Sequence, residues 1–545
     1  MADGAVKSST REFDVVVVGA GFSGLYMLHR LRGLGFSVRV YEAGDGVGGT
    51  WYWNRYPGAR VDIESMEYSY SFSPDLADEW EWSERYASQP ELLRYLNHVA
   101  DRFDLRPDIQ LNTRVTAARF DEASMRWNLK TSTGESISAK FCVMATGCLS
   151  IPKAPEFPGV ENFKGATYST SSWPKDGVDF TGMRVGVIGT GSSAIQSIPM
   201  IAAQAAHLTV FQRTPNFSVP AHNGPIDPAL VEDWKEHREQ YKDEARAAGF
   251  GIRMVEESTQ TALEVSEDER RDVYETRWNR GGFALIGAYS DLIADKAAND
   301  TAVAFVAEKI ASIVKDPKVA DILTPKTYPI ATKRLCVDTG YYATFNRDNV
   351  TLVDVGAAPI EAVTPTGLKT AKAEYELDAI VFAIGFDAMT GALTGIDIRG
   401  RGGVSMKQKW AEGPKTYLGL MVCGFPNLFT VTGPGSPSVL CNMAVAIEQH
   451  VDWITDCISY LSDRQVGAIE ATSGAEAEWV AHVNEVADGT LFPHANSWYM
   501  GANVPGKPRV FMPYIGGFPV YREKCEEVAA KGYEGFALTS AAHAS

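Results

Sequence analysis

A glycine turn between an apolar run and a helix-like run places the strongest constraint on how this chain folds. The apolar run, residues 13–18, is rich in β-branched side chains. Gly19, Gly21 and Gly24 follow it in the spacing GxGxxG, and a second β-branched run ends at Glu42, 23 residues after Gly19. In a strand–turn–helix–strand unit the first glycine makes the tight turn, the second admits a pyrophosphate, and the third lets helix and strand pack closely. The stretch predicts dinucleotide binding, with Glu42 accepting a ribose hydroxyl.

The same pattern returns in the middle of the chain. Residues 183–188 form another β-branched run, a GxGxxA turn follows, and the next strand-like run ends at Arg213, 24 residues after Gly189. A guanidinium at this position suits the 2′-phosphate of NADP, whereas a carboxylate would repel it. We therefore expect NADPH at the second turn and FAD at the first. The expected nucleotide contacts of the second turn are Gly189, Gly191, Ser192 and Ser193.

These two units predict an α/β fold with two Rossmann-like dinucleotide-binding domains and a helical insertion. We expect residues 1–148 and 387–545 to form the FAD-binding domain. Prolines after residue 151 mark a linker into the NADPH-binding domain, which we expect over residues 149–223 and 329–386. Residues 224–328 are charged and helical in period, so they predict the insertion.

Composition excludes several classes of partner. The chain carries a formal net charge of −17, which argues against nucleic acid and anionic membrane as partners. Any anionic ligand must then be held by local positive groups. No stretch reaches the roughly 18 apolar residues needed to span a bilayer, and residues 1–10 lack the apolar core of a signal peptide. We expect a cytoplasmic monomer.

Cysteine and histidine usage narrows the chemistry further. The seven cysteines are scattered without a CxxC pair, and the nine histidines show no ligand spacing. We therefore expect no metal site. Two dinucleotide sites on one chain imply hydride transfer from NADPH to flavin, after which the electrons need an acceptor. A disulfide reductase would need a cysteine pair, whereas a monooxygenase needs O2 and a positive group.

Two further motifs carry a resemblance to a known family. The first reads GxWxxxx[FY]PGxxxD and is filled by Gly49, Trp51, Tyr56, Pro57, Gly58 and Asp62. The second reads FxGxxxHxxxW[PD] and runs from Phe163 to Pro174, with Ser169 where the family has histidine. With these motifs the chain resembles the type I Baeyer-Villiger monooxygenases, which are class B flavoprotein monooxygenases. The family histidine is thought to help couple NADP binding to catalysis. A serine at this position bears on the efficiency of coupling more than on the reaction class, and the interpretation that we favour is a tolerated variant.

The resemblance implies roles for residues of this chain. It makes Arg334 the catalytic residue that stabilises a flavin C4a-peroxide anion, and Asp62 the acid that pairs with it. A guanidinium suits this role because it stays charged and donates several hydrogen bonds. The implied cofactor contacts are Gly49, Thr50, Trp51 and Asp62, together with Lys333 at the 2′-phosphate and Trp498 over the cofactor. The implied substrate pocket comprises Val61, Ile63, Gln89, Cys148, Leu149, Ser438, Val439, Leu440 and Met443.

The expected function is therefore NADPH- and O2-dependent oxidation of aryl, cyclic or linear ketones to esters or lactones. The expected partners are a small-molecule ketone and O2. An N- or S-oxygenating flavin monooxygenase is an alternative, and it would not need the pair of Asp62 and Arg334. An uncoupled NADPH oxidase or reductase, or a redox sensor, is a further alternative that would oxygenate no organic product.

Overall fold

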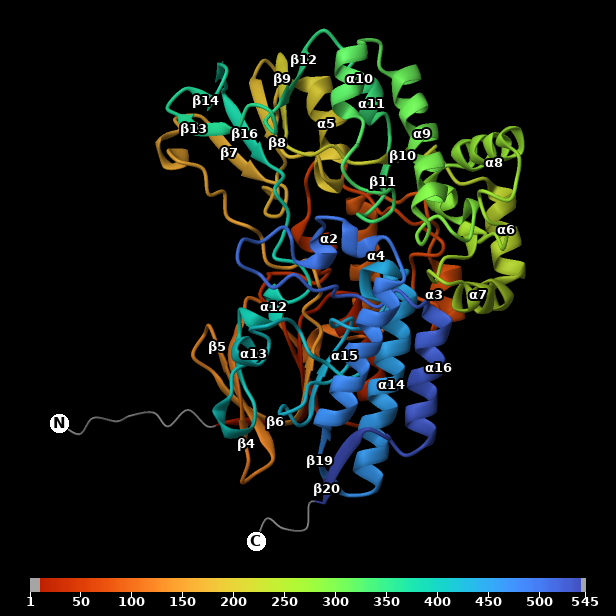
Figure 1. Cartoon of the computed structure of the whole chain (residues 1–545). Helices are drawn as coiled ribbons and strands as arrows, with labels where there is room; N and C mark the ends of the chain where they lie inside the picture. Colours follow the sequence, from red (N-terminus) through yellow and green to blue (C-terminus); the bar gives the residue numbers. More distant parts are fainter. Residues whose placement is uncertain (1–9, 541–545) are drawn as a thin grey trace, which may run out of the picture.

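The computed structural model describes residues 10–540 and contains two sheets of mainly parallel strands, one above the other in Figure 1. The lower sheet has the strand order β17-β4-β5-β6-β1-β2-β3, and β18 pairs with β6. Its strands are β1 (Arg11–Val18), β2 (Val38–Tyr41), β3 (Ile109–Gln110), β4 (Val115–Asp121), β5 (Arg126–Thr131), β6 (Ser136–Met144), β17 (Asp397–Arg399) and β18 (Leu428–Thr430). Segments from both ends of the chain therefore build this sheet.

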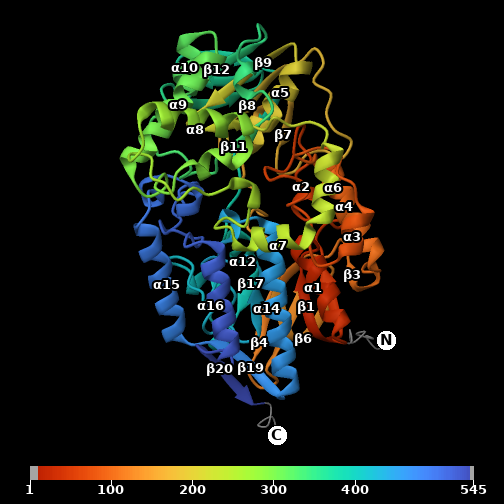
Figure 2. The same cartoon turned by 90° about the vertical axis from the view of Figure 1, so that its right-hand side faces the viewer.

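The central strand β1 is buried on both faces. Val15 and Val17 face one apolar core, and Val16 and Val18 face another on the opposite side of the sheet. Side chains alternate along a strand, so a strand covered on both faces reads as a continuous apolar run. The lower half of the molecule also holds α1 (Phe22–Gly33), α12 (Gly391–Thr394), α13 (Met406–Lys409), α14 (Met443–Asp463), α15 (Ser473–Asp488), α16 (Phe518–Ala530) and the hairpin of β19 (Val466–Ala471) and β20 (Phe536–Ser540) (Figures 1 and 2). At mid-height, between the two sheets, lie α2 (Thr50–Trp53), α3 (Pro74–Glu79) and α4 (Gln89–Arg102) (Figure 1).

The upper sheet is wholly parallel and has the order β12-β9-β8-β16-β7. Its strands are β7 (Ala166–Ser169), β8 (Arg184–Ile188), β9 (His207–Gln212), β12 (Val350–Asp354) and β16 (Ala379–Phe382). Around it lie α5 (Ser192–Gln204), α9 (Lys296–Ile313), α10 (Pro317–Leu323), α11 (Tyr341–Thr344), the pair of β10 (Ser218–Pro220) and β11 (Cys336–Asp338), and the antiparallel strands β13 (Ile360–Thr364), β14 (Gly367–Thr370) and β15 (Glu374–Glu376).

A helical layer covers one side of the molecule between the two sheets, and it faces the viewer in Figure 2. It consists of α6 (Pro228–Glu236), α7 (Arg238–Ala247), α8 (Glu267–Arg280) and the 3-10 helix η4 (Gly282–Ala288). The expectation of an α/β fold with two dinucleotide-binding units and added helices is confirmed. The exact domain boundaries stay predictions.

The described part of the chain shows neither a membrane-spanning helix nor a cluster of metal ligands. Within residues 10–540 no helix is both long and apolar enough to cross a membrane. The same residues contain no group of three or more histidine, cysteine, aspartate or glutamate side chains placed to hold a metal ion. The interpretation of the N-terminus depends on residues 1–9, which lie outside the described range.

Candidate active site and nucleotide sites

The first glycine turn requires glycine for reasons of space. Gly19 has a φ of +106°, and a Cβ built on it would lie 2.5 Å from the carbonyl oxygen of Ala145. A Cβ on Gly24 would lie 1.9 Å from the carbonyl oxygen of Gly19. Both contacts are far shorter than any real van der Waals contact. A side chain at Gly24 would force α1 away from the turn after β1, and one at Gly19 would force this turn away from the segment after β6.

The N-terminus of α1 fits the pyrophosphate of a dinucleotide. Gly21 is the N-cap residue, and no side chain accepts from the first backbone N–H groups of this helix. By contrast, the carboxylate of Asp295 caps α9 by accepting from a backbone N–H. Uncapped N–H groups and the helix dipole favour an anion at this point. Gly49 approaches from the neighbouring loop, just before Thr50 and Trp51 begin α2.

The carboxylate of Glu42 has hydrogen-bond partners within the protein, in addition to the ribose hydroxyl that it is predicted to accept. Its carboxylate is buried and accepts from the backbone N–H groups of Ala20, at 2.8 Å, and Gly44, at 2.7 Å. The side chain thus fixes the glycine turn against the loop that follows β2. A carboxylate has further lone pairs, so it can still accept a hydroxyl.

The second glycine turn repeats this construction. Gly189 has a φ of +110°, and a Cβ on it would lie 2.4 Å from the carbonyl oxygen of Ala383. Gly191 caps α5 without any side-chain hydrogen bond, and nothing lies within 4 Å of a Cβ built on it. Ser192 and Ser193 form the first turn of α5. The space and the free N–H groups fit a second pyrophosphate.

Two cationic side chains, those of Arg213 and Lys333, lie near this second turn. Burial, and then the charge of Arg213, lower the pKa of Lys333 to about 8 from its ordinary 10.5. The Lys333 ammonium lies 4.2 Å from the ring centroid of Tyr328. Within residues 10–540 neither cation has a carboxylate oxygen within 4.0 Å. Unpaired neighbouring cations fit a phosphate, which would relieve their mutual repulsion.

Arg334 and Asp62 form a bidentate ion pair, although 272 residues separate them in the sequence. The guanidinium donates from Nε to Oδ2 at 2.9 Å and from Nη2 to Oδ1 at 2.8 Å. The exposed fractions of the two side chains are 24% and 26%. The pair is therefore held rigidly while a ligand can still reach it.

Further contacts fix the position of the guanidinium. Nη1 donates to the carbonyl oxygen of Val439 at 2.8 Å, and the group lies 4.7 Å from the ring centroid of Phe283 in η4. Burial alone would lower the pKa of Arg334, but the charge and hydrogen bonds of Asp62 outweigh it and raise the pKa above its ordinary value. The buried Tyr499 hydroxyl also lies close enough to feel both charges. Arg334 thus stays charged at any working pH.

Comparisons with known proteins decide the family. Residues 16–277 match the family model described as pyridine nucleotide-disulphide oxidoreductase. A "Baeyer-Villiger monooxygenase" of Pseudooceanicola batsensis is 44% identical over 97% of this chain and 96% of its own length. The chain belongs to the type I Baeyer-Villiger monooxygenases. It is thus an FAD-containing, NADPH-dependent enzyme that oxidises ketones to esters or lactones.

Two more comparisons describe the range of this monooxygenase family. A solved steroid monooxygenase bound to NADP is 55% identical, with a TM-score of 0.93, and the match covers 97% of this chain and all of that one. A phenazine N-monooxygenase of Lysobacter antibioticus is 43% identical over 98% of both chains. The seven cysteines, all within residues 10–540, are free in this structure.

Most of the expected pocket residues either adjoin Asp62 in the sequence or belong to the apolar cluster that contains Val439, whose carbonyl oxygen accepts from Arg334. Val61 and Ile63 flank Asp62 in the sequence, and both are buried. One apolar cluster includes Cys148, Leu149, Val439, Leu440, Met443 and Trp498. Two expected residues are tied to backbone instead: the amide of Gln89 donates to the Trp51 carbonyl oxygen, and the Ser438 hydroxyl donates to that of Thr432 at 3.1 Å. Their part in the pocket stays a prediction.

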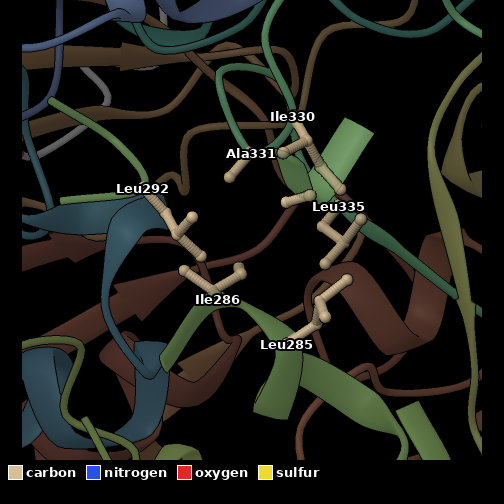
Figure 3. A pocket seen from close by; sticks show the side chains of 7 residues that line it. Leu285, Ile286, Leu292, Ile330, Ala331 and Leu335 are labelled. Atoms are coloured by element: carbon tan, nitrogen blue, oxygen red, sulfur yellow. The ribbon is translucent and has the colours of Figure 1, made fainter. Parts of the chain in front are cut away.

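A small apolar cavity lies beside the segment that carries the arginine (Figure 3). Its volume is about 10 Å³, and its lining residues are Leu285, Ile286, Leu292, Ala302, Ile330, Ala331 and Leu335. Ala331 has a φ of +68°, a left-handed conformation that costs an alanine roughly 1 kcal/mol. The segment that carries Arg334 therefore contains a strained backbone conformation at Ala331, next to this small apolar cavity.

A second cavity adjoins Asp62 and is lined by both charged and apolar side chains. It measures about 20 Å³ and is lined in part by Asp62, Glu64, Arg85, Arg280 and Phe283. This volume and lining suffice for one ordered water molecule. Such a water molecule would lie next to Asp62, which also binds Arg334.

Ser169 lies at the end of β7, opposite Phe382 of β16. Its hydroxyl oxygen is 2.8 Å from that of Ser171. In place of the family histidine, this chain therefore has a serine whose hydroxyl group forms a local hydrogen bond with Ser171. The effect of this serine on coupling stays a prediction.

Sequence reasoning missed the Val439 carbonyl oxygen and the Phe283 ring. A carbonyl oxygen has no sequence signature, because every residue carries one. Phe283 lies in the helical insertion, for which the sequence predicts no part in the active site. No local pattern distinguishes this phenylalanine from an ordinary core residue.

Proposed function

We propose that Arg334 is the catalytic residue of this monooxygenase and that Asp62 positions it. The bidentate ion pair between them carries the proposal, because it fixes the plane and the direction of a permanent positive charge. The Val439 carbonyl oxygen and the Phe283 ring hold two further sides of the guanidinium. A charge that is already oriented need not reorganise when negative charge develops, which is the condition for strong transition-state stabilisation.

The chain's residues divide the work with the cofactors. Bound FAD, reduced by NADPH, supplies the redox chemistry with O2, and the protein supplies placement and charge. We propose that the uncapped N-termini of α1 and α5 hold the two pyrophosphates. Arg213 and Lys333 hold the 2′-phosphate, and the Arg334 guanidinium stabilises oxyanion charge beside the ketone carbonyl. The apolar side chains around Val439 exclude water from that carbonyl and suit a ketone with an apolar body.

The test is an aerobic assay of the FAD-loaded protein with NADPH, labelled O2 and a panel of aryl, cyclic and linear ketones. Mass spectrometry scores label in the ester or lactone, and hydrogen peroxide is measured in parallel. Arg334→Ala should lower ester formation about 100-fold or more while NADP+ binding persists. Arg271→Ala is the matched control, because it removes an exposed arginine of α8 that pairs with Glu308. Undiminished ester formation by Arg334→Ala would refute the role.

N-oxygenation is a second candidate, because a phenazine N-monooxygenase is as similar as the Baeyer-Villiger relative. Nitrogen oxidation needs no stabilised oxyanion on the substrate. An aromatic N-heterocycle should therefore join the ketone panel. N-oxide formation that survives in Arg334→Ala, together with no ester from any ketone in the unmodified protein, would favour this second function.

We further propose a small-molecule substrate and a cytoplasmic, monomeric protein. The seven free cysteines, six of which are buried, support a reducing compartment. Light scattering of the purified protein would test the monomer.

A further inference from the structure

The two segments that connect the sheets lie side by side as one unit. The chain leaves the lower sheet after β6 and returns to it after β16. The backbone N–H of Lys153 donates to the carbonyl oxygen of Gly385 at 3.1 Å, and Pro152 and Phe386 form an antiparallel bridge. Lys153 is therefore fixed by its backbone at the carboxyl edge of the upper sheet, where the loops after β8 and β9 also begin.

A segment near the C-terminus binds to both connections. Lys153 Nζ donates to the carbonyl oxygen of Asn503 at 2.6 Å, and Asn503 Nδ2 donates to the carbonyl oxygen of Phe386 at 2.7 Å. Lys507 Nζ donates to Asp387 Oδ1 at 2.6 Å. Residues 503–507 are thus tied to the edge that carries the second nucleotide site.

The two lysines in these contacts differ in one respect. Lys507 has a carboxylate partner, whereas Lys153 has no carboxylate oxygen within 4.0 Å among residues 10–540. Burial, and then the charge of Arg213, lower the pKa of Lys153, while the more distant charges of Glu156 and Asp387 act in the opposite direction. Arg213 affects Lys333 in the same way. Arg213 follows β9 directly, so it lies at the same carboxyl edge of the upper sheet as Lys153, and among residues 10–540 none of Lys153, Arg213 and Lys333 has a carboxylate oxygen within 4.0 Å.

These three cations fit a ligand that carries two negative charges on a single small functional group. In a chain of net charge −17, cations without a paired carboxylate provide a local attraction for an anion. An ammonium has three N–H donors, and Lys153 uses one of them on Asn503. A phosphate monoester presents three acceptor oxygens and nearly two charges at pH 7.

We propose that Lys153 is a third cation for the 2′-phosphate of NADP and helps to determine the preference for NADP over NAD. This inference depends on the proposed assignment of Arg213 and Lys333 to that phosphate. Because Nζ also holds Asn503, the bound phosphate fixes residues 503–507 against the nucleotide edge. A nucleotide without the 2′-phosphate makes no such contact with Lys153.

The test measures dissociation constants of NADP+ and NAD+ by titration calorimetry on the FAD-loaded protein. Lys153→Met should raise the dissociation constant of NADP+ roughly tenfold, the usual effect of losing one charge-assisted hydrogen bond, and leave that of NAD+ within about twofold. Lys164→Met is the matched control: it removes the same charge from an exposed site in the same linker. Lys153→Arg should retain NADP+ affinity, and it serves if Lys153→Met fails to fold.

The outcomes separate this inference from the function itself. An unchanged dissociation constant of NADP+ in Lys153→Met would overturn the inference and leave the function standing. Equal weakening of NADP+ and NAD+ would also overturn it, because Lys153 would then act only by holding residues 503–507. A wild-type protein that binds both nucleotides equally would overturn the 2′-phosphate site itself, and the inference with it.

Discussion

The lowered pKa of Lys333 leads to a pH dependence of NADP+ binding. The pKa of about 8 belongs to the nucleotide-free protein, where burial and the charge of Arg213 disfavour the ammonium. A 2′-phosphate binds the ammonium and not the neutral amine. About a tenth of the lysine is neutral at pH 7 and about nine tenths at pH 9, so the dissociation constant of NADP+ should rise about tenfold over this range. The phosphate stays doubly ionised throughout, because its second pKa is near 6.

Titration calorimetry in buffers of equal ionic strength measures this rise. NAD+ is the first control, and its affinity should not change over the same range. Lys333→Arg is the second, because a guanidinium keeps its charge and should flatten the profile even if its different shape alters the affinity. A flat profile for the wild type, or a rise that persists undiminished in Lys333→Arg, would refute the reasoning.

Three further changes have defined outcomes. Asp62→Asn leaves the arginine beside it without a carboxylate, so single-turnover ketone oxygenation should slow about 100-fold without a change in NADP+ affinity. Gly24→Ala should cost about 3 kcal/mol or lose FAD, measured by melting and by flavin absorbance, whereas Gly33→Ala in the same helix, with open space for its Cβ, should do neither. Burial raises the pKa of Glu67 from 4.5 to about 7. Relative to Glu67→Gln, wild-type unfolding free energy should therefore fall by up to about 3 kcal/mol as pH rises from 4.5 to 7, and parallel pH profiles in urea unfolding would contradict this.

The sequence predicted the parts of the fold that depend on neighbours along the chain. A glycine turn, its flanking strand and helix, and the residue at the end of the next strand all lie within about 25 residues of one another. Their geometry follows from strand pairing and helix packing over that short stretch. For this reason the sequence predicted that Gly19, Gly24 and Gly189 make tight turns or close helix–strand packing. The positive φ angles of Gly19 and Gly189, and the lack of space for a Cβ at all three positions, agree with this prediction.

The proposed catalytic role of Arg334 could be predicted only through the resemblance to a family. Arg334 has no periodic or compositional signal, and its partner Asp62 lies 272 residues away. Gln89 and Ser438 were predicted to line the pocket, but both side chains donate hydrogen bonds to backbone carbonyl oxygens. No sequence pattern predicts these two hydrogen bonds. A residue type in a motif does not determine where its side chain points.

The sequence by itself determined that the chain has two dinucleotide-binding units, because these depend on local spacing, and it predicted from one charge which nucleotide each unit binds. Only the tertiary structure decided that the Val439 carbonyl oxygen and the Phe283 ring hold Arg334, and that Lys153 lies within reach of the charge of Arg213. Those contacts join segments from different sheets and from the helical layer. They form when distant apolar faces pack together, and a linear pattern does not encode which groups then meet.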